Sequence, residues 1–322
     1  MRFIFQIVLL SAAAIGLGAC SIDNASRVPM TEQAGPMLQV LGTLQDGGAP
    51  HIGCKRPCCR NLFLRPATDR KVVCLGVTDT NAEGERVGAM LEATPDFPEQ
   101  LQAFQSAQDI PLDRLSVFLT HAHIGHYSGL MFLGREALGA KNVDVWAMPR
   151  FRDFLSSNGP WSQLVELGNI RLNSLTELQP VSIGESARVV PLLVPHRDEY
   201  SETVGYRIEG PRKAALFIPD INKWELWERA LEEELAKVDY AFLDATFYDA
   251  EEVGYRDMAE IPHPFMVETM QRLGGLPSTE KTKVHFIHLN HTNPCLDTTS
   301  QAYRTVIGSG FHVARFGQTL PL

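Results

Sequence analysis

Short apolar runs bounded by Gly, Pro, Asn or Asp recur along the chain. Such runs, rich in Val, Ile, Leu and Phe, predict buried β-strands. We expect strands at residues 37–44, 61–64, 71–77, 115–120, 143–148, 188–195, 204–208, 214–219, 240–243, 283–289 and 311–316. Helical spacing of apolar residues or a proline-led start predicts helices at residues 98–108, 129–138, 149–156, 161–167, 223–237, 264–273 and 298–307. The order of these elements, without strict βα alternation, predicts an α/β fold of two sheets with helices outside.

The first residues resemble an export signal. Arg2 precedes an apolar stretch at residues 3–14, which ends in Leu17-Gly18-Ala19-Cys20. This pattern predicts a cleaved lipoprotein signal peptide at residues 1–19, a lipid on Cys20, a polar tether at 20–36 and a single domain at 37–322. A plain secretory signal with an incidental cysteine is the alternative. We therefore expect a bacterial envelope protein, anchored at the outer membrane through Cys20 and facing the periplasm.

Composition limits the possible partners. The chain has 322 residues, 44% of them hydrophobic, and a formal net charge of −9. A nucleic-acid partner requires a basic surface, so none is expected, and a small-molecule substrate fits better. Trp224 and Trp227 are expected to anchor the core or an interface.

The most specific chemical signal is the segment Thr120-His121-Ala122-His123-Ile124-Gly125-His126. It follows an apolar strand, and His121 and His123 are two residues apart, so both point to the same side of an extended chain. His126 lies where the chain turns toward a helix and can face the same point. Three converging imidazoles suit a borderline-soft cation such as zinc.

Three further polar residues come directly after apolar strands: His196, Asp220 and His288. Side chains at strand ends commonly line a site, because the sheet positions them while loops admit substrate. Taken singly, each of them fits a capping or turn residue equally well. Together with the first cluster they form a series of ligands.

On these residues the chain resembles the metallo-β-lactamase superfamily, whose His-x-His-x-Asp-His motif matches His121, His123 and His126. It looks most like the pyrroloquinoline quinone biosynthesis protein B group, on residues 45–48, the cysteines near residue 58, and residues 244–247 and 288–294. It is also similar to the tRNA 3′-processing endonuclease and the phosphonate-pathway cyclic phosphodiesterase. The resemblance implies an αββα sandwich with metal ions at one edge of two mixed sheets.

The resemblance also implies the metal ligands. One ion would be held by His121, His123 and His196, a second by His126 and His288, with Asp220 bridging the two. Gly125 stands where the family has aspartate, so the second site lacks a carboxylate and is expected to be weakened, water-completed or empty. Zinc is the expected ion, as one or two ions, with manganese or iron as alternatives.

The chemistry implied is hydrolysis by a metal-bound hydroxide. His263 corresponds to a histidine that protonates the leaving group or contacts phosphate in the phosphodiesterase members, and a loop histidine without a role is the alternative. Asp244 is expected to orient a ligand imidazole, and His291 to contact substrate or to support a ligand. His285 and His312 alternate with apolar residues and are expected to be packed.

A second cluster contains His51, Cys54, Cys58 and Cys59. Three thiolates and an imidazole can complete a tetrahedral structural zinc site. A disulfide is the competing interpretation for an exported protein, although adjacent cysteines rarely bond each other.

Two functional hypotheses follow. The first is a metal-dependent hydrolase of a small phosphodiester, ester or lactone in the cell envelope. The second is a non-catalytic binding or carrier protein for a quinone-like cofactor precursor, which Gly125 would favour.

Overall fold

Two seven-stranded mixed sheets pack face to face in the computed structural model, which describes residues 35–254 and 257–322. The first sheet contains β1 Met37–Gly42, β2 Cys74–Thr80, β3 Arg86–Leu91, β4 Leu115–Phe118, β5 Val143–Ala147, β6 Ile170–Ser174 and β14 Thr319–Pro321. Its order is β14-β1-β2-β3-β4-β5-β6. The strands are antiparallel from β14 to β3 and parallel from β3 to β6.

The second sheet has a similar division into an antiparallel and a parallel half. Its order is β13-β12-β11-β10-β9-β8-β7, parallel from β10 to β13 and antiparallel from β7 to β10. Its strands are β7 Val181–Ser182, β8 Arg188–Leu193, β9 Val204–Glu209, β10 Ala214–Ile218, β11 Tyr240–Asp244, β12 Val284–Ile287 and β13 His312–Val313.

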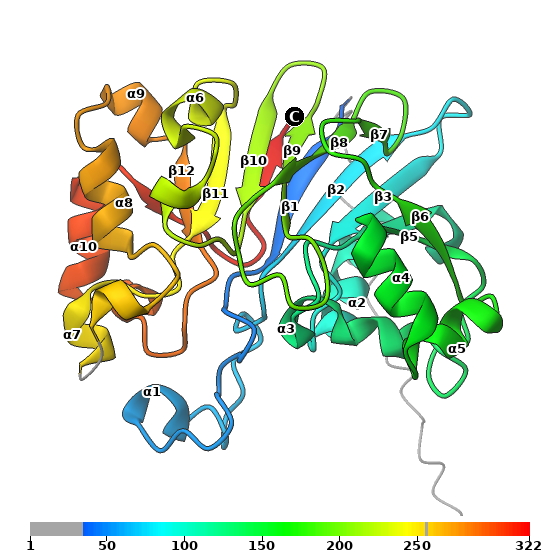
Figure 1. The fold of residues 1–322 in the computed structure, drawn as a ribbon, viewed down its shortest axis with the longest axis horizontal. Helices are drawn as coiled ribbons and strands as arrows, with labels where there is room; N and C mark the ends of the chain where they lie inside the picture. The colour runs from blue at the N-terminus through cyan, green and yellow to red at the C-terminus, as the bar shows by residue number, and fades with distance from the viewer. Residues whose placement is uncertain (1–34, 255–256) are drawn as a thin grey trace, which may run out of the picture. The chain divides into compact units, whose positions relative to one another are not determined.

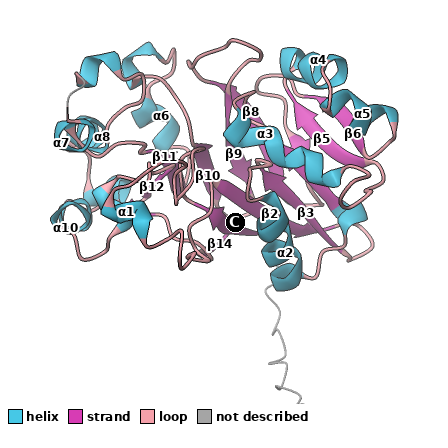
Figure 2. Cartoon of the chain, turned by 90° about the horizontal axis from the view of Figure 1, so that it is seen from below, coloured by secondary structure: helices cyan, strands magenta, loops and turns pink. Residues whose placement is uncertain are grey.

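Helices cover the outer face of each sheet (Figures 1 and 2). The first sheet carries α2 Phe97–Gln108, α3 Ile124–Tyr127, α4 Pro149–Ser157 and α5 Trp161–Glu166. The second carries α6 Leu231–Leu235, α8 Met266–Leu273 and α10 Gln301–Gly308. Shorter helices are α1 Pro57–Arg60, α7 Ala250–Val253 and α9 Ser278–Lys281. The predicted αββα sandwich is confirmed.

Strand alternation divides the apolar residues into three layers. In β10, Ala215 and Phe217 belong to the layer between the sheets, whereas Leu216 and Ile218 face the helices of the second sheet. Successive side chains of a strand point to opposite faces, so a strand covered on both faces is apolar throughout. The run of apolar residues that predicted this strand therefore reflects burial on both sides.

Several predicted elements differ from the structure. Residues 61–64 form turns after α1 rather than a strand, and β3 and β6 were not predicted. The segment 223–237 is not one helix, because only Leu231–Leu235 is α-helical. Its two tryptophans are buried as expected, and their indole N–H groups donate at 2.8 Å to the Thr269 hydroxyl and the Leu193 carbonyl, which fixes the segment in a non-helical path.

The predicted signal peptide, Cys20 and the tether up to residue 34 lie outside the described residues. Among the residues that the structure describes, no helix combines the length and apolar character that a membrane crossing requires.

Candidate metal centre

The strand ends bring the predicted ligands together. His121 follows β4, His196 follows β8, Asp220 follows β10 and His288 follows β12. The strands β8, β10 and β12 run in the same direction in their sheet, so their carboxyl ends meet at one edge. Helix α3, which carries His126, lies at this end of the sheets (Figure 1).

Four side chains form the first cluster: His121, His123, His196 and Asp220. One ligand atom from each lies within 4.8 Å of all the others. The Nε2 atom of His121 is 2.9 Å from Nδ1 of His123, and Nε2 of His196 is 3.3 Å from that same atom. Three imidazole nitrogens and a carboxylate oxygen around one point are a donor set that zinc prefers.

Asp220, a member of this cluster, also faces His126. Its Oδ2 atom is 3.4 Å from His121 Nε2, 3.3 Å from His196 Nε2 and 3.7 Å from His126 Nε2. A single carboxylate oxygen thus faces imidazoles of both expected sites, which is the position required of a bridging ligand.

A second group contains His126 and His288. In each ring Nδ1 is engaged: His126 Nδ1 lies 3.1 Å from Glu92 Oε1, and His288 Nδ1 lies 2.9 Å from Thr246 Oγ1. The two Nε2 atoms are buried and have no hydrogen-bond partner among the described residues. A histidine that donates through one nitrogen presents the lone pair of the other, as metal-bound histidines do.

The sequence analysis missed the carboxylate beside this second group. Asp46, in the loop after β1, forms a set with His126 and His288 whose ligand atoms lie within 4.8 Å of one another. Asp46 contributes to the family resemblance only as one of residues 45–48, and nothing local in the sequence places that segment beside His288.

Glu92 is a second residue that the sequence analysis missed. It is fully buried, and its Oε1 atom accepts a hydrogen bond from Thr120 Oγ1 at 2.6 Å besides facing His126. Thr120 Oγ1 also lies 2.8 Å from His121 Nδ1. Glu92 and His288 both have a positive φ, 95° and 64°. Non-glycine residues rarely adopt such conformations, which concentrate at functional sites.

Asp244 and His263 lie beside the centre. His263 Nδ1 lies 2.9 Å from Asp244 Oδ2 and 3.1 Å from Asp220 Oδ1. Asp244 Oδ1 accepts hydrogen bonds from the backbone N–H and hydroxyl of Thr246, the residue that faces His288. Asp244 and Thr246 therefore fix the rings of His263 and His288 relative to Asp220.

Electrostatics leave His121, His196 and Asp220 in the protonation states that bind cations. Burial lowers the pKa of His121 well below its ordinary value and that of His196 to about 4, so both imidazoles are neutral. Burial raises the pKa of Asp220, but the imidazoles of His263 and His196 outweigh this effect and hold that pKa well below its usual range. Neutral imidazoles and an ionised carboxylate fit zinc. At His126 the effect of burial is outweighed by the carboxylate of Glu92, which raises the pKa to about 9, so an ion bound there would displace a proton.

The cysteine cluster forms with a different histidine from the one predicted. Cys54, Cys58, Cys59 and His291 bring their ligand atoms within 4.8 Å. His51 is not in this set: its ring stacks on that of His291 at 4.4 Å, and its Nδ1 lies 2.9 Å from the Ile52 carbonyl oxygen. The neighbouring thiols are 3.9 Å apart, too far for a disulfide. His291, expected near the substrate, therefore belongs to the cysteine cluster.

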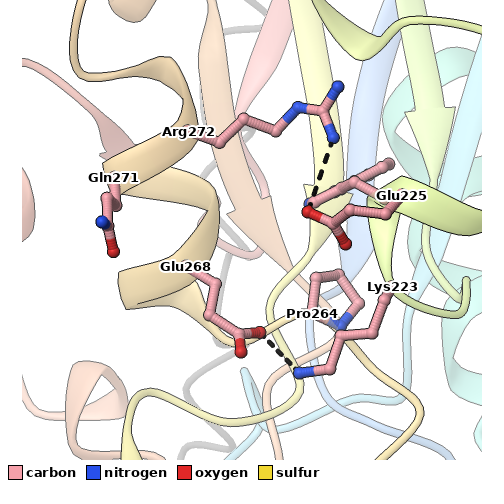
Figure 3. A pocket seen from close by; sticks show the side chains of 7 residues that line it. Lys223, Glu225, Pro264, Glu268, Gln271 and Arg272 are labelled. Carbon is pink, nitrogen blue, oxygen red and sulfur yellow. Dashed lines mark hydrogen bonds and ion pairs between the residues drawn. The ribbon is translucent and has the colours of Figure 1, made fainter. Parts of the chain in front are cut away.

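A pocket along helix α8 contains none of these ligands. It has a volume of about 590 Å³ and lies next to His263 in sequence, through Pro264 (Figure 3). Its charged residues are already paired, Lys223 with Glu268 at 2.6 Å and Arg272 with Glu225 at 3.8 Å. We therefore take the histidine cluster, rather than this pocket, as the candidate functional site.

The chain belongs to the beta-lactamase superfamily: a profile of the beta-lactamase superfamily domain matches residues 90–288, more than half of its length. This match confirms the superfamily that the His-x-His motif indicated.

Among individual proteins, the chain is similar to coenzyme PQQ synthesis protein B from Methylococcus capsulatus, with 26% identity over 89% of this chain and 100% of the relative. The zinc-bound PqqB from Methylobacterium extorquens has a similar structure, with a TM-score of 0.71 and 22% identity over 89% of this chain and 100% of that one. A diphosphatase of the PhnP family has a TM-score of 0.60 and 20% identity over 89% and 97% of the two chains. At these identities the two structures show the shared fold.

The comparison corrects the predicted location. The relatives are proteins of coenzyme synthesis, matched over essentially their whole length, which contradicts a lipoprotein of the cell envelope. The predicted lipid anchor at Cys20, the membrane association and the periplasmic location are therefore wrong. The error arose because a short apolar stretch before Ala19-Cys20 matches the export pattern regardless of what the rest of the chain does.

Proposed function

We propose that this chain is a metal-dependent hydrolase of a small phosphodiester, ester or lactone. The observation that carries the proposal is the convergence of His121, His123, His196 and Asp220 within 4.8 Å at one edge of the sandwich. Zinc bound there supplies a hydroxide at neutral pH and polarises a phosphoryl or carbonyl oxygen. The diphosphatase with the same fold supports a phosphoryl substrate.

The burial of the side chains indicates where substrate approaches. The side chains of His121, His196 and Asp220 are at most 3% exposed, whereas those of His123 and His263 are 14% and 16% exposed. Because the deep side chains are inaccessible, substrate would reach the centre past the more exposed side chains of His123 and His263.

We assign His263 to proton transfer. Its Nδ1 atom is held between the carboxylates of Asp220 and Asp244, which fixes the ring, so Nε2 is the atom available to a leaving group. Asp220 would act both as bridging ligand and as the group that orients this imidazole. General acid catalysis of this kind typically contributes a factor of about 10²–10⁴.

We also propose a structural zinc ion at Cys54, Cys58, Cys59 and His291. Three thiols and one imidazole are a common closed tetrahedral zinc set. Cys59 is fully buried whereas Cys58 is exposed, so an ion there would tie the loop surface to the underlying protein.

A second candidate function is the binding of a quinone-like cofactor precursor without turnover. The similarity to coenzyme PQQ synthesis protein B over 89% of the chain favours it. The two candidates share the metal centre and differ in whether the bound molecule reacts.

The experiment combines metal analysis with a substrate panel. Purified protein is loaded with zinc and assayed on bis-p-nitrophenyl phosphate, p-nitrophenyl esters and lactones, beside His121→Gln and a matched control, His312→Gln, which lies on β13 outside the centre. We expect turnover by the unmodified protein and the control, and loss of at least about 100-fold in His121→Gln. Zinc-loaded protein that is inert on the whole panel but binds a quinone-like compound supports the carrier. Full activity of His121→Gln contradicts the metal centre.

A further inference from the structure

Gly125 occupies the motif position where the superfamily has an aspartate, and the structure shows what stands in its place. A Cβ atom built on Gly125 would overlap the Cβ of Asp46 and lie 2.9 Å from its Cγ. The side chain of Asp46 thus fills the volume that a side chain at position 125 would need. A side chain at 125 and this placement of Asp46 exclude each other.

The Asp46 loop is anchored beside His288 by backbone hydrogen bonds. The N–H of Gln45 donates to the Leu289 carbonyl at 2.9 Å, and the N–H of Leu289 donates to the Thr43 carbonyl at 2.9 Å. These bonds join Leu289, the residue after His288, to Thr43 and Gln45, which precede Asp46, so Asp46 and His288 are held close together. Asp46 Oδ1 lies 3.7 Å from His288 Nε2.

The atoms that face Asp46 are those without partners. His126 Nε2 and His288 Nε2 are buried with no hydrogen bond from the described residues, although leaving a buried polar atom without a partner is unfavourable. Their other nitrogens are already held by Glu92 and Thr246. The lone pairs thus converge on the side from which the Asp46 carboxylate approaches.

We propose that Asp46 is a ligand of the second cation and supplies, from the loop after β1, the carboxylate that Gly125 lacks. This inference rests on the metal centre of the proposed function. The second cation site then consists of His126, His288, Asp46 and the bridging Asp220. With the carboxylate of Asp46 in place, a weak affinity for the second cation is no longer expected from Gly125.

A reciprocal exchange tests the proposal by metal count rather than by activity. Protein is dialysed against limiting zinc and its bound ions are counted by mass spectrometry. We expect Asp46→Gly to lose one ion, and Asp46→Gly combined with His126→Gln to lose that same single ion. The double variant Asp46→Gly/Gly125→Asp should regain it through a shift of the loop at residue 46, because the new Cβ would otherwise lie 2.5 Å from the Cα there. Gly125→Asp alone should lower the melting temperature, because two side chains would compete for one place.

Controls separate the possible failures. Asp69→Gly changes an exposed loop aspartate and should keep the full count. Asp46→Asn preserves the shape of the side chain and replaces Asp46→Gly if that variant does not fold. A full ion count in Asp46→Gly or Asp46→Asn overturns the assignment of Asp46, as does an unmodified protein that binds a single ion at the histidines. No loss of ions in His121→Gln overturns the proposed function itself.

Discussion

At the scale of single residues, the centre depends on side chains that do not face a cation directly. The carboxylate of Glu92 receives the Thr120 hydroxyl and faces His126 Nδ1, and the same hydroxyl lies against His121 Nδ1. One buried carboxylate therefore orients one imidazole of each predicted site. Such partners fix the ring orientation and raise the basicity of a ligating histidine.

Glu92→Gln should weaken cation binding about 10- to 100-fold, the usual cost of losing such a partner. The amide keeps the shape but loses the negative charge that faces His126. Competition with a zinc-binding dye measures the affinity, and Glu136→Gln, at an exposed glutamate, is the matched control. Unchanged affinity in Glu92→Gln would show that the imidazoles are oriented by something else.

A pH-dependent contribution to stability is expected at His285, on β12. Burial lowers its pKa to about 4, with smaller effects from His312 and Arg315. Between pH 6.5 and pH 4, His285 therefore binds a proton in the unfolded chain but not in the folded protein. The free energy of unfolding is thus unaffected by this group above pH 6.5 and falls as the pH drops from 6.5 toward 4. Proton uptake by His285 in the unfolded chain should lower the free energy of unfolding by about 2 kcal/mol when the pH falls from 7.5 to 5.

The measurement compares His285→Gln with the unmodified protein by urea unfolding at both pH values. On acidification the free energy of unfolding of the variant should fall by about 2 kcal/mol less than that of the unmodified protein. The contributions of all other groups are common to both proteins and cancel in this comparison. Equal losses would mean that His285 is protonated in the folded state as well.

The residue scale also shows what the sequence could reveal. The spacing of His121, His123 and His126 after a strand was sufficient to predict a metal site, because it depends only on local geometry. Asp46 could not be found, since its position depends on pairing between the loop after β1 and the end of β12. The choice of His291 over His51 depends on packing between the same distant segments.

At the scale of elements, helix α2 packs directly on the first sheet through glycines. A Cβ on Gly76 would lie 2.5 Å from the ring of Phe104, and one on Gly88 would lie 3.1 Å from it. Because Gly76 on β2 and Gly88 on β3 have no side chain, this fully buried ring rests on the strand backbones. This contact stabilises the packing of α2 on the first sheet and involves none of the predicted metal ligands.

Phe104→Ala should therefore destabilise the protein by about 3–5 kcal/mol, because it removes a buried ring and leaves a cavity between helix and sheet. Urea unfolding measures the change, and Ser106→Ala, on the exposed side of the same helix, should stay within about 0.5 kcal/mol. The bound cations should be unaffected. A loss below about 1 kcal/mol would show that the helix does not depend on this contact.

The same packing explains which elements could be predicted. Strands such as β10, apolar throughout because both faces are covered, were recognised from their composition. Strand β3 was missed because Gly88 and Ala89 weaken its strand character, although both are buried. The helix expected at 223–237 failed because hydrogen bonds of Trp224 and Trp227 to other elements override its helical period.

At the scale of the whole molecule, the cysteine cluster and the histidine centre are connected. His51 stacks on His291 of the cysteine cluster, and a Cβ on Gly47 would lie 2.6 Å from the His51 ring. The loop that carries Asp46 thus rests on a histidine braced by the cluster. A structural ion there should stabilise the loop that carries Asp46 beside the metal centre.

Cys58→Ser should lose the structural ion and also lower zinc affinity at the second histidine site roughly tenfold, the usual effect of losing a residue that supports a ligand from outside. Zinc titration followed by mass spectrometry measures both effects. Cys295→Ala changes a thiol outside the cluster and should keep both ions. Loss of the structural ion with unchanged affinity at the centre would show that the two clusters are independent.

The most direct test of the metal centre is anomalous scattering at the zinc absorption edge from crystals of the zinc-loaded, unmodified protein. The account predicts density among His121, His123, His196 and Asp220, further density among Asp46, His126 and His288, and a separate peak at the cysteines. Zinc at the cysteines with no anomalous signal among the histidines would contradict it.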